Sequence, residues 1–194
     1  MMALKVKYNA PVVLTFSLVC IIVFYLDKWV FTSLIDNNFV LFGRWSPTNP
    51  MDYFRLLSNT MGHASQEHII GNLSIFLLIA PMMEEKYGSR QIAMMILVTA
   101  VASGLLHVFF FDHGVLGASG LVFMFIVLSS FADVKKGSIP MTFILVAIFY
   151  LGSEVIHSFE NDQISQFGHI TGGVLGAIFG FIIPDAKSSA EGLV

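Results

Sequence analysis

The sequence predicts an all-α membrane protein, a bundle of six transmembrane helices with both ends of the chain on the inner side (N-in/C-in). Three observations lead to this fold class. The chain of 194 residues is 56% hydrophobic and only 12% charged, whereas soluble domains carry about 25% charged residues. Its apolar residues are gathered in separate runs. Its lysine and arginine residues are divided unevenly between the segments that connect those runs.

The apolar runs have the lengths that membrane-spanning helices need. A spanning helix takes about 17–25 mostly apolar residues. Four runs meet that length, and the first two must borrow flanking residues. The runs cover residues 12–26, 68–83, 92–111, 115–132, 139–157 and 167–184. We therefore expect one membrane domain over residues 11–184, with a short cytoplasmic segment at 1–10 and a cytoplasmic tail at 185–194.

The first run could instead belong to a signal peptide, with Lys5 and Lys7 as its charged region. No small-x-small cleavage site follows this run, and the bulky Trp29 comes soon after it. We therefore expect an uncleaved first helix. The single cysteine, Cys20, lies within the run and excludes an intramolecular disulfide framework.

The positive residues favour one orientation of the bundle. Lysine and arginine near helix ends are enriched on the cytoplasmic side. If residues 1–10 are inside, the outer segments hold only Lys28, Arg44 and Arg55. The inner segments then hold Lys5, Lys7, Lys86, Arg90, Lys135, Lys136 and Lys187. This excess predicts that the first and last segments are both inside.

The connections between the runs differ in length. Residues 84–91 and 133–138 are expected to be short inner connections, 112–114 a tight outer turn, and 158–166 a polar outer loop. Residues 27–66 form the only long loop and mix aromatic with charged residues. This loop either lies partly in the membrane interface, where Trp and Tyr are favoured, or only connects the first two helices. The sequence leaves both interpretations open.

Alternation of the runs brings three polar clusters to one face. The second, fourth and sixth helices must run in the same direction, so their first turns lie at the same depth. These turns contain His68 and Asn72, then Ser119, and finally His169. Polar residues within the bilayer are costly and are candidates for function.

Glycines predict which of these helices pack together. Gly168, Gly172, Gly176 and Gly180 recur every four residues, and the fourth helix begins with Gly114, Gly117 and Gly120. Small residues let helix backbones approach closely in lipid. We expect the fourth and sixth helices to pack closely, with Ser119 near His169. Such stripes also occur in many bundles that have no catalytic role.

The three clusters together predict a serine hydrolase site. A serine needs a base to act as a nucleophile, and His169 is the best candidate for that base. The backbone N–H of Ser119, in a first helical turn, could bind an oxyanion together with His68 and Asn72. Phe123 lies four residues after Ser119 and could stack on the His169 ring.

Other chemistries fit less well. No carboxylate is evident beside His169, and Asp112 and Glu154 are the nearest guesses, so we expect a dyad. Zinc proteases need ligand pairs such as H-E-x-x-H, but Asn72 stands where the second histidine would be. We therefore expect no metal and no other cofactor. Four further polar residues are expected to make ordinary hydrogen bonds inside the bundle: Ser17, Ser74, Ser103 and His107.

At this point the sequence resembles the rhomboid family of intramembrane serine proteases. Gly117-Ala118-Ser119-Gly120 is similar to the nucleophile motif of the family. The segment with His63, His68 and Asn72 resembles the family's second helix, and 168–176 resembles its catalytic-histidine helix. Glu84 and Gly88 resemble its E-x-x-x-G pattern, and Arg55 its Trp-Arg pair. The resemblance covers roughly residues 50–184.

The resemblance implies an endopeptidase that cleaves transmembrane segments of other proteins near their outer end, through an acyl-enzyme. Ser119 would be the nucleophile and His169 the general base. His68, Asn72 and the Ser119 N–H would form the oxyanion hole. The supporting residues would be Phe123, His63, Gly117, Gly120 and Gly172.

The resemblance further implies a minimal six-helix bacterial form in the inner membrane, with the lipid bilayer and transmembrane substrates as partners and no nucleic acid. It does not set the oligomeric state. Phe54 stands where tryptophan is common, and Phe123 where many members have tyrosine. Two other functions remain open: an inactive rhomboid-like protein that binds membrane clients, and a small transporter. The retained serine and histidine argue against the first. The absence of inverted repeats argues against the second.

Overall fold

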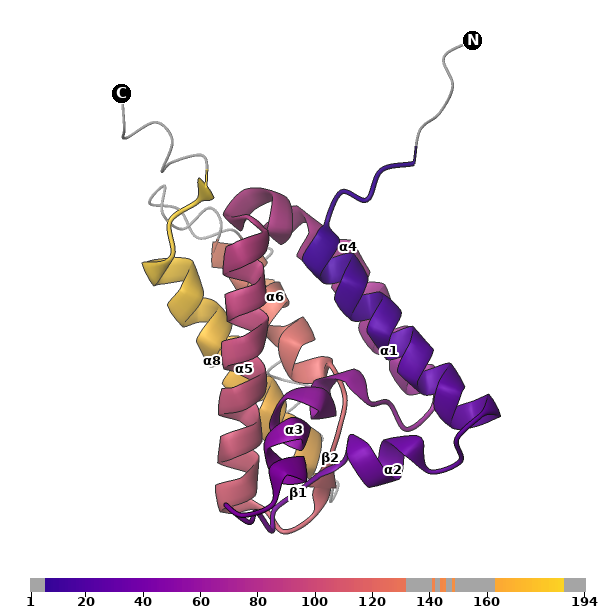
Figure 1. The fold of residues 1–194 in the computed structure, drawn as a ribbon. Coiled ribbons are helices and arrows are strands. Elements are labelled where there is room, and N and C mark those ends of the chain that lie inside the picture. The colour runs from indigo at the N-terminus through magenta and orange to yellow at the C-terminus, as the bar shows by residue number, and fades with distance from the viewer. Residues whose placement is uncertain (1–5, 132–140, 142–143, 146–147, 149–162, 187–194) are drawn as a thin grey trace.

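The computed structural model describes residues 6–131, 141, 144–145, 148 and 163–186 (Figure 1). Most of the predicted fifth helix, the connection 133–138 and Glu154 lie outside the described residues. The elements in order are α1 (Pro11–Trp29), α2 (Leu34–Asn38), β1 (Leu41–Phe42), α3 (Pro50–Ser58), η1 (Asn59–Met61), α4 (Gln66–Tyr87), α5 (Ser89–Phe110), β2 (Gly114–Val115), α6 (Ser119–Phe131) and α8 (Gln163–Ile182).

Two of the described helices are long and apolar enough to cross a membrane. These are α1 and α5, with mean hydropathies of 1.9 and 2.2. The apolar parts of α6 and α8 are shorter, at Ser119–Ser130 and Phe167–Ile182. Helix α4 is as long as α5, but polar and charged residues occupy both of its ends. By length and composition, the described residues therefore support two of the six predicted spans.

Glu84 holds the beginning of α1 against the end of α4. Its buried carboxylate accepts hydrogen bonds from the backbone N–H groups of Val12 and Val13, both at 3.0 Å. N–H groups in a first helical turn have no carbonyl partner within their own helix, and negative charge is favoured there. Lys86 lies 3.5 Å from Asp185, just after α8. The beginning of α1 and the ends of α4 and α8 thus meet at one end of the bundle.

The predicted connection at 84–91 is wrong, because α4 continues to Tyr87 and α5 begins at Ser89. Only Gly88 separates the two helices, with a φ of 84° that glycine adopts without steric cost. The polar residues that indicated a loop are instead helical, and their side chains have partners elsewhere: Glu84 at the beginning of α1, and Lys86 at Asp185.

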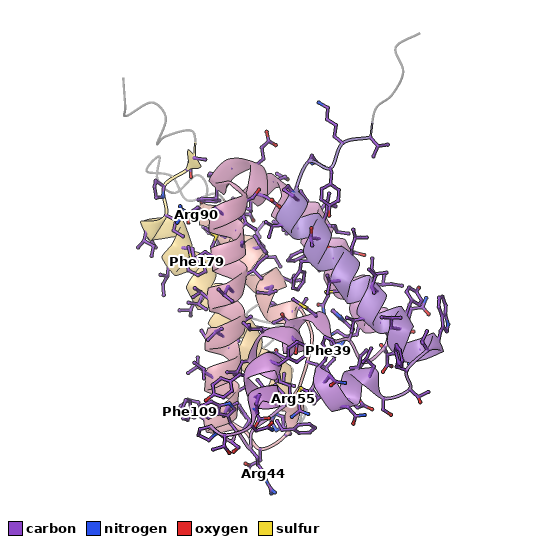
Figure 2. All side chains as sticks on the ribbon, viewed as in Figure 1. Phe39, Arg44, Arg55, Arg90, Phe109 and Phe179 are labelled. Carbon is purple, nitrogen blue, oxygen red and sulfur yellow. The ribbon has the colours of Figure 1, made fainter. Side chains whose placement is uncertain are left out.

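The opposite end of the bundle, called the loop end below, carries α2, β1, α3, η1 and β2 (Figure 1). The long loop at 27–66 is therefore structured. Strand β1 pairs antiparallel with β2, with Leu41 opposite Val115. Arg55 ties the loop together, since its guanidinium contacts Asp52 at 3.1 Å and donates to the backbone carbonyl of Asn37 at 2.6 Å. Figure 2 shows Arg55 among these loop elements.

Aromatic and aliphatic side chains fill the centre of the bundle. Phe76 of α4 is fully buried between Phe16 of α1, at 5.2 Å between ring centroids, and Phe125 of α6, at 5.4 Å. The same core includes Ile92 and Met95 of α5. This core fixes α1, α4, α5 and α6 relative to one another.

Helices α6 and α8 pack backbone against backbone, as the glycine pattern predicted. A Cβ atom added to Gly172 would overlap the carbonyl oxygen of Gly120, and one added to Gly176 would overlap that of Met124. Gly120 in turn faces the carbonyl oxygen of Gly168, at 3.2 Å from an ideal Cβ. Only glycine permits this approach.

Two predicted boundaries at the loop end are wrong. The fourth run was expected to begin at 115, but Val115 belongs to β2 and the helix begins at Ser119. Pairing with β1 and the positive φ of Gly117 keep residues 114–117 out of the helix. The predicted loop 158–166 is partly helical, because α8 begins at Gln163.

We expect Glu84→Ala to lower the free energy of unfolding by about 1–3 kcal/mol, since it leaves two buried N–H groups without acceptors. Thermal unfolding in detergent would measure the loss. Glu85→Ala is the matched control, because Glu85 is the adjacent acid and is exposed. Equal stability of the two variants would contradict the capping role of Glu84.

Candidate functional site

A cavity of about 240 Å³ lies at the loop end of the bundle. It is bounded by the beginnings of α4, α6 and α8, by the second half of α5, and by the residues between β2 and α6. Its lining includes His68, Thr99, Ser103, His107, Gly117, Ser119, Phe167 and Gly168. A cavity of this size and polarity can hold several water molecules. The three segments that the sequence placed at one depth therefore border one space.

Gly117 permits the close contact between α4 and the residues before α6. Its φ of 123° is rare for residues with a side chain. An ideal Cβ there would lie 2.7 Å from both Cε1 and Nε2 of His68, and 3.6 Å from Nδ2 of Asn72. Its N–H donates to the backbone carbonyl of Asn59 at 2.8 Å. The side chains of His68 and Asn72 therefore both lie against the Gly117 backbone.

Asn72 presents a hydrogen-bond donor that has no acceptor. Its Nδ2 is buried and has no partner among the residues that the structure describes. His68, one turn earlier on α4, lies on the same helix face. Ser65 sets the start of this helix, because its hydroxyl accepts the N–H of His68 at 3.2 Å. A buried donor without a partner is costly, which makes Asn72 a candidate for contact with a ligand.

His63 supports the ring of His68 from the connection before α4. The two rings meet edge to face at 5.0 Å. His63 is 1% exposed, and its Nδ1 lies 3.3 Å from the carbonyl oxygen of Met61, to which it can donate. Burial, helped by the neighbouring His68, lowers the pKa of His63 to about 4. The His63 ring is therefore uncharged at pH 7 and packs against the ring of His68.

Ser119 is the first residue of α6 and borders the cavity. Its backbone N–H belongs to the turn whose N–H groups have no acceptor within the helix. The positive end of the helix dipole lies at this point. Ser119 is partly exposed.

The ring of His169 stacks flat on the ring of Phe123, with 4.2 Å between centroids and 9° between planes. This is the stacking that the sequence suggested. Phe123 lies four residues after Ser119 and thus on the same face of α6. The imidazole of His169 is therefore on the side of α6 that carries Ser119.

Several sequence candidates lie outside this cluster. Arg55 fastens the long loop, Glu84 caps α1 and Gly88 joins α4 to α5. Asp112 is exposed in the turn after α5. Within residues 6–131 and 163–186, no group of three His, Cys, Asp or Glu side chains is placed to hold a metal ion.

A polar stripe on α5 also borders the cavity, which was not predicted from the sequence. Thr99, Ser103 and His107 recur every four residues on an otherwise apolar helix and line the cavity. Ser17 bonds back to the carbonyl of Val13 as expected, but the expectation for Ser103 is wrong. The hydroxyls of Ser103 and Thr99 are buried and have no hydrogen-bond partner in the described part of the chain. The four-residue spacing of Thr99, Ser103 and His107 could have predicted from the sequence that they share one helix face.

Comparison with known proteins identifies the family of this chain. The sequence model of the Rhomboid domain family matches residues 50–186, which is more than half of the chain. The chain belongs to the Rhomboid domain family. This rhomboid-family protein is also similar to the rhomboid protease GlpG of Haemophilus influenzae, with 25% identity over 134 residues that cover 68% of this chain and 70% of that protein.

The close packing of α6 on α8 in this rhomboid-family protein can be tested by substitution. We expect Gly172→Ala to separate the two helices, because its Cβ would overlap the Gly120 carbonyl. Overpacking of this kind costs about 1–3 kcal/mol. Gly173→Ala is the control on the same helix, because its Cβ would meet only the Val127 side chain, at 3.5 Å. Thermal unfolding should distinguish the two, and equal midpoints would contradict the close approach.

Proposed function

We propose that this chain is a multi-pass membrane protein and an intramembrane serine endopeptidase. The supporting observation is that His68 and Ser119 line one cavity, while Asn72 lies against the adjoining Gly117 backbone and the His169 ring stacks on Phe123 of α6. Membership of the Rhomboid domain family and similarity to a rhomboid protease add to this support. The membrane domain would be residues 11–184, with the N-in/C-in orientation that the lysine and arginine distribution favours.

The first chemical step is attack of the Ser119 hydroxyl on the carbonyl carbon of a peptide bond in a transmembrane segment. His169 accepts the hydroxyl proton as general base. The resulting oxyanion receives hydrogen bonds from the Ser119 N–H and from Asn72, and His68 contributes a further donor. Donors that are held in place before reaction lower the barrier because they need no reorganisation.

The second step forms and hydrolyses an acyl-enzyme. His169 passes its proton to the leaving amine, the peptide bond breaks, and the substrate acyl group stays on Ser119. Water from the cavity then gives a proton to His169 and attacks the ester carbon. The peptide carboxylate leaves and Ser119 regains its proton. No cofactor takes part in this scheme.

Phe123 has a defined role in this proposal. Flat stacking on its ring holds the imidazole of His169 in one plane, so that Nε2 or Nδ1 can be aimed toward Ser119. Because Phe123 has no hydroxyl, it orients the ring through contact alone. In this proposal the stack on Phe123 constrains the plane of the His169 ring.

We expect Ser119→Ala and His169→Ala each to reduce cleavage of a transmembrane substrate in liposomes by at least about 10³-fold, because nucleophile and base act as one unit. Ser74→Ala is the serine control, since Ser74 is exposed on α4. Unchanged cleavage in either site variant would contradict the proposal. Client binding without any cleavage by the wild type would instead indicate an inactive, client-binding relative.

Asn72→Ala should lower kcat by about 10²-fold or more with little change in KM, because removal of one oxyanion donor acts on the transition state. Stopped assays over a range of substrate densities in the bilayer would separate the two constants. A rise in KM at constant kcat would assign Asn72 to substrate binding and remove it from the oxyanion hole.

A further inference from the structure

A cluster of rings joins the end of α5 to the beginning of α8. Phe111, directly after α5, meets Phe167 of α8 edge to face at 5.2 Å between centroids. Phe110 contacts the same ring at 5.8 Å. Phe167 stands only two residues before His169. The position of the His169 turn is thus coupled to the loop end of α5.

His107 fixes the other side of this cluster. Its ring stacks on Phe111 at 5.4 Å with 19° between planes, and it is 4% exposed. Its Nε2 donates to the backbone carbonyl of His113 at 2.8 Å. Phe111 is therefore held between a buried histidine on α5 and the ring of Phe167. The turn 111–114 is anchored to α5 by the same hydrogen bond.

Phe167 and His169 contact different parts of the bundle from positions two residues apart on α8. The glycine contact between α6 and α8 is made by backbone atoms, at Gly120 and Met124 of α6. Residues two apart on a helix point in nearly opposite directions, about 200° apart. Phe167 points to α5 while His169 stacks on Phe123 of α6. Two rings held by two different helices set the rotation of α8.

We infer that Phe111 and Phe167 act as positioning residues for His169, by locking the first turn of α8 in rotation and depth. The expected effect on catalysis rests on the proposed function. The expected effect on the position of the His169 ring does not, because that position can be measured in a protein without activity. Neither residue touches the reacting atoms.

The expected result for Phe167→Ala and Phe111→Ala is a fall in kcat of about 10- to 100-fold with KM unchanged, since small displacements of a catalytic group have effects of this size. Because each removes one side of the same contact, the double variant should fall little further than either single variant. Phe167→Tyr keeps the ring and should restore most of the activity. Phe109→Ala is the matched control, because Phe109 is 73% exposed near the same end of α5 (Figure 2).

A second readout keeps the inference testable if the chain is not a protease. In protein with isotope-labelled histidine, the ring signal of His169 should show the shift caused by stacking on Phe123, and His169→Ala identifies that signal. Phe167→Ala should move it toward the unstacked position, whereas Phe109→Ala should not. If Phe167→Ala leaves this signal at its wild-type position, the inference is wrong. If the signal moves but Ser119→Ala still cleaves, the proposed function fails and the positioning role stands.

Discussion

The contact between the glycine faces of α6 and α8 is the constraint on which the site depends. Gly172 and Gly176 allow the backbone of α8 to lie directly on the carbonyl groups of Gly120 and Met124. At this separation the His169 ring reaches Phe123 and lies flat on it. A methyl group at Gly172 would require the helices to move apart. Ser119 and His169 come from segments about fifty residues apart, and this packing is what brings those segments together.

A second close approach involves Gly117, two residues before Ser119, and the side chains of His68 and Asn72. Gly117 has a positive φ and no side chain, so His68 and Asn72 can lie against its backbone. The same turn ends β2 and allows α6 to begin at Ser119. Gly117 thus lets α6 begin at Ser119 and lets α4 approach the residues before that helix. The long loop supports this arrangement through the β1–β2 pairing and the bond from Gly117 to Asn59.

The sequence could predict what depends on spacing. Glycines four residues apart in the last apolar run predicted the α6–α8 contact, and the four-residue step from Ser119 to Phe123 suggested the stacked ring. Helix boundaries at Val115 and Gly88 were wrong because partners distant in sequence decide them: a strand at Leu41 for the first, and contacts of Glu84 with α1 for the second. The start of α8 at Gln163 was also predicted wrongly. The aromatic cluster around Phe167 could not be predicted, because its rings come from two elements whose mutual rotation is set only in three dimensions. The stripe of Thr99, Ser103 and His107 was predictable from its spacing.

The central claim is that Ser119 is an activated nucleophile whose activation requires His169. The most direct measurement is reaction of the protein with a fluorophosphonate, followed by mass spectrometry of the peptides. The account predicts a single adduct on Ser119 in the wild type, and none in His169→Ala when folding is normal. Labelling of Ser119 at an equal rate in both proteins, or an adduct on another serine alone, would contradict it.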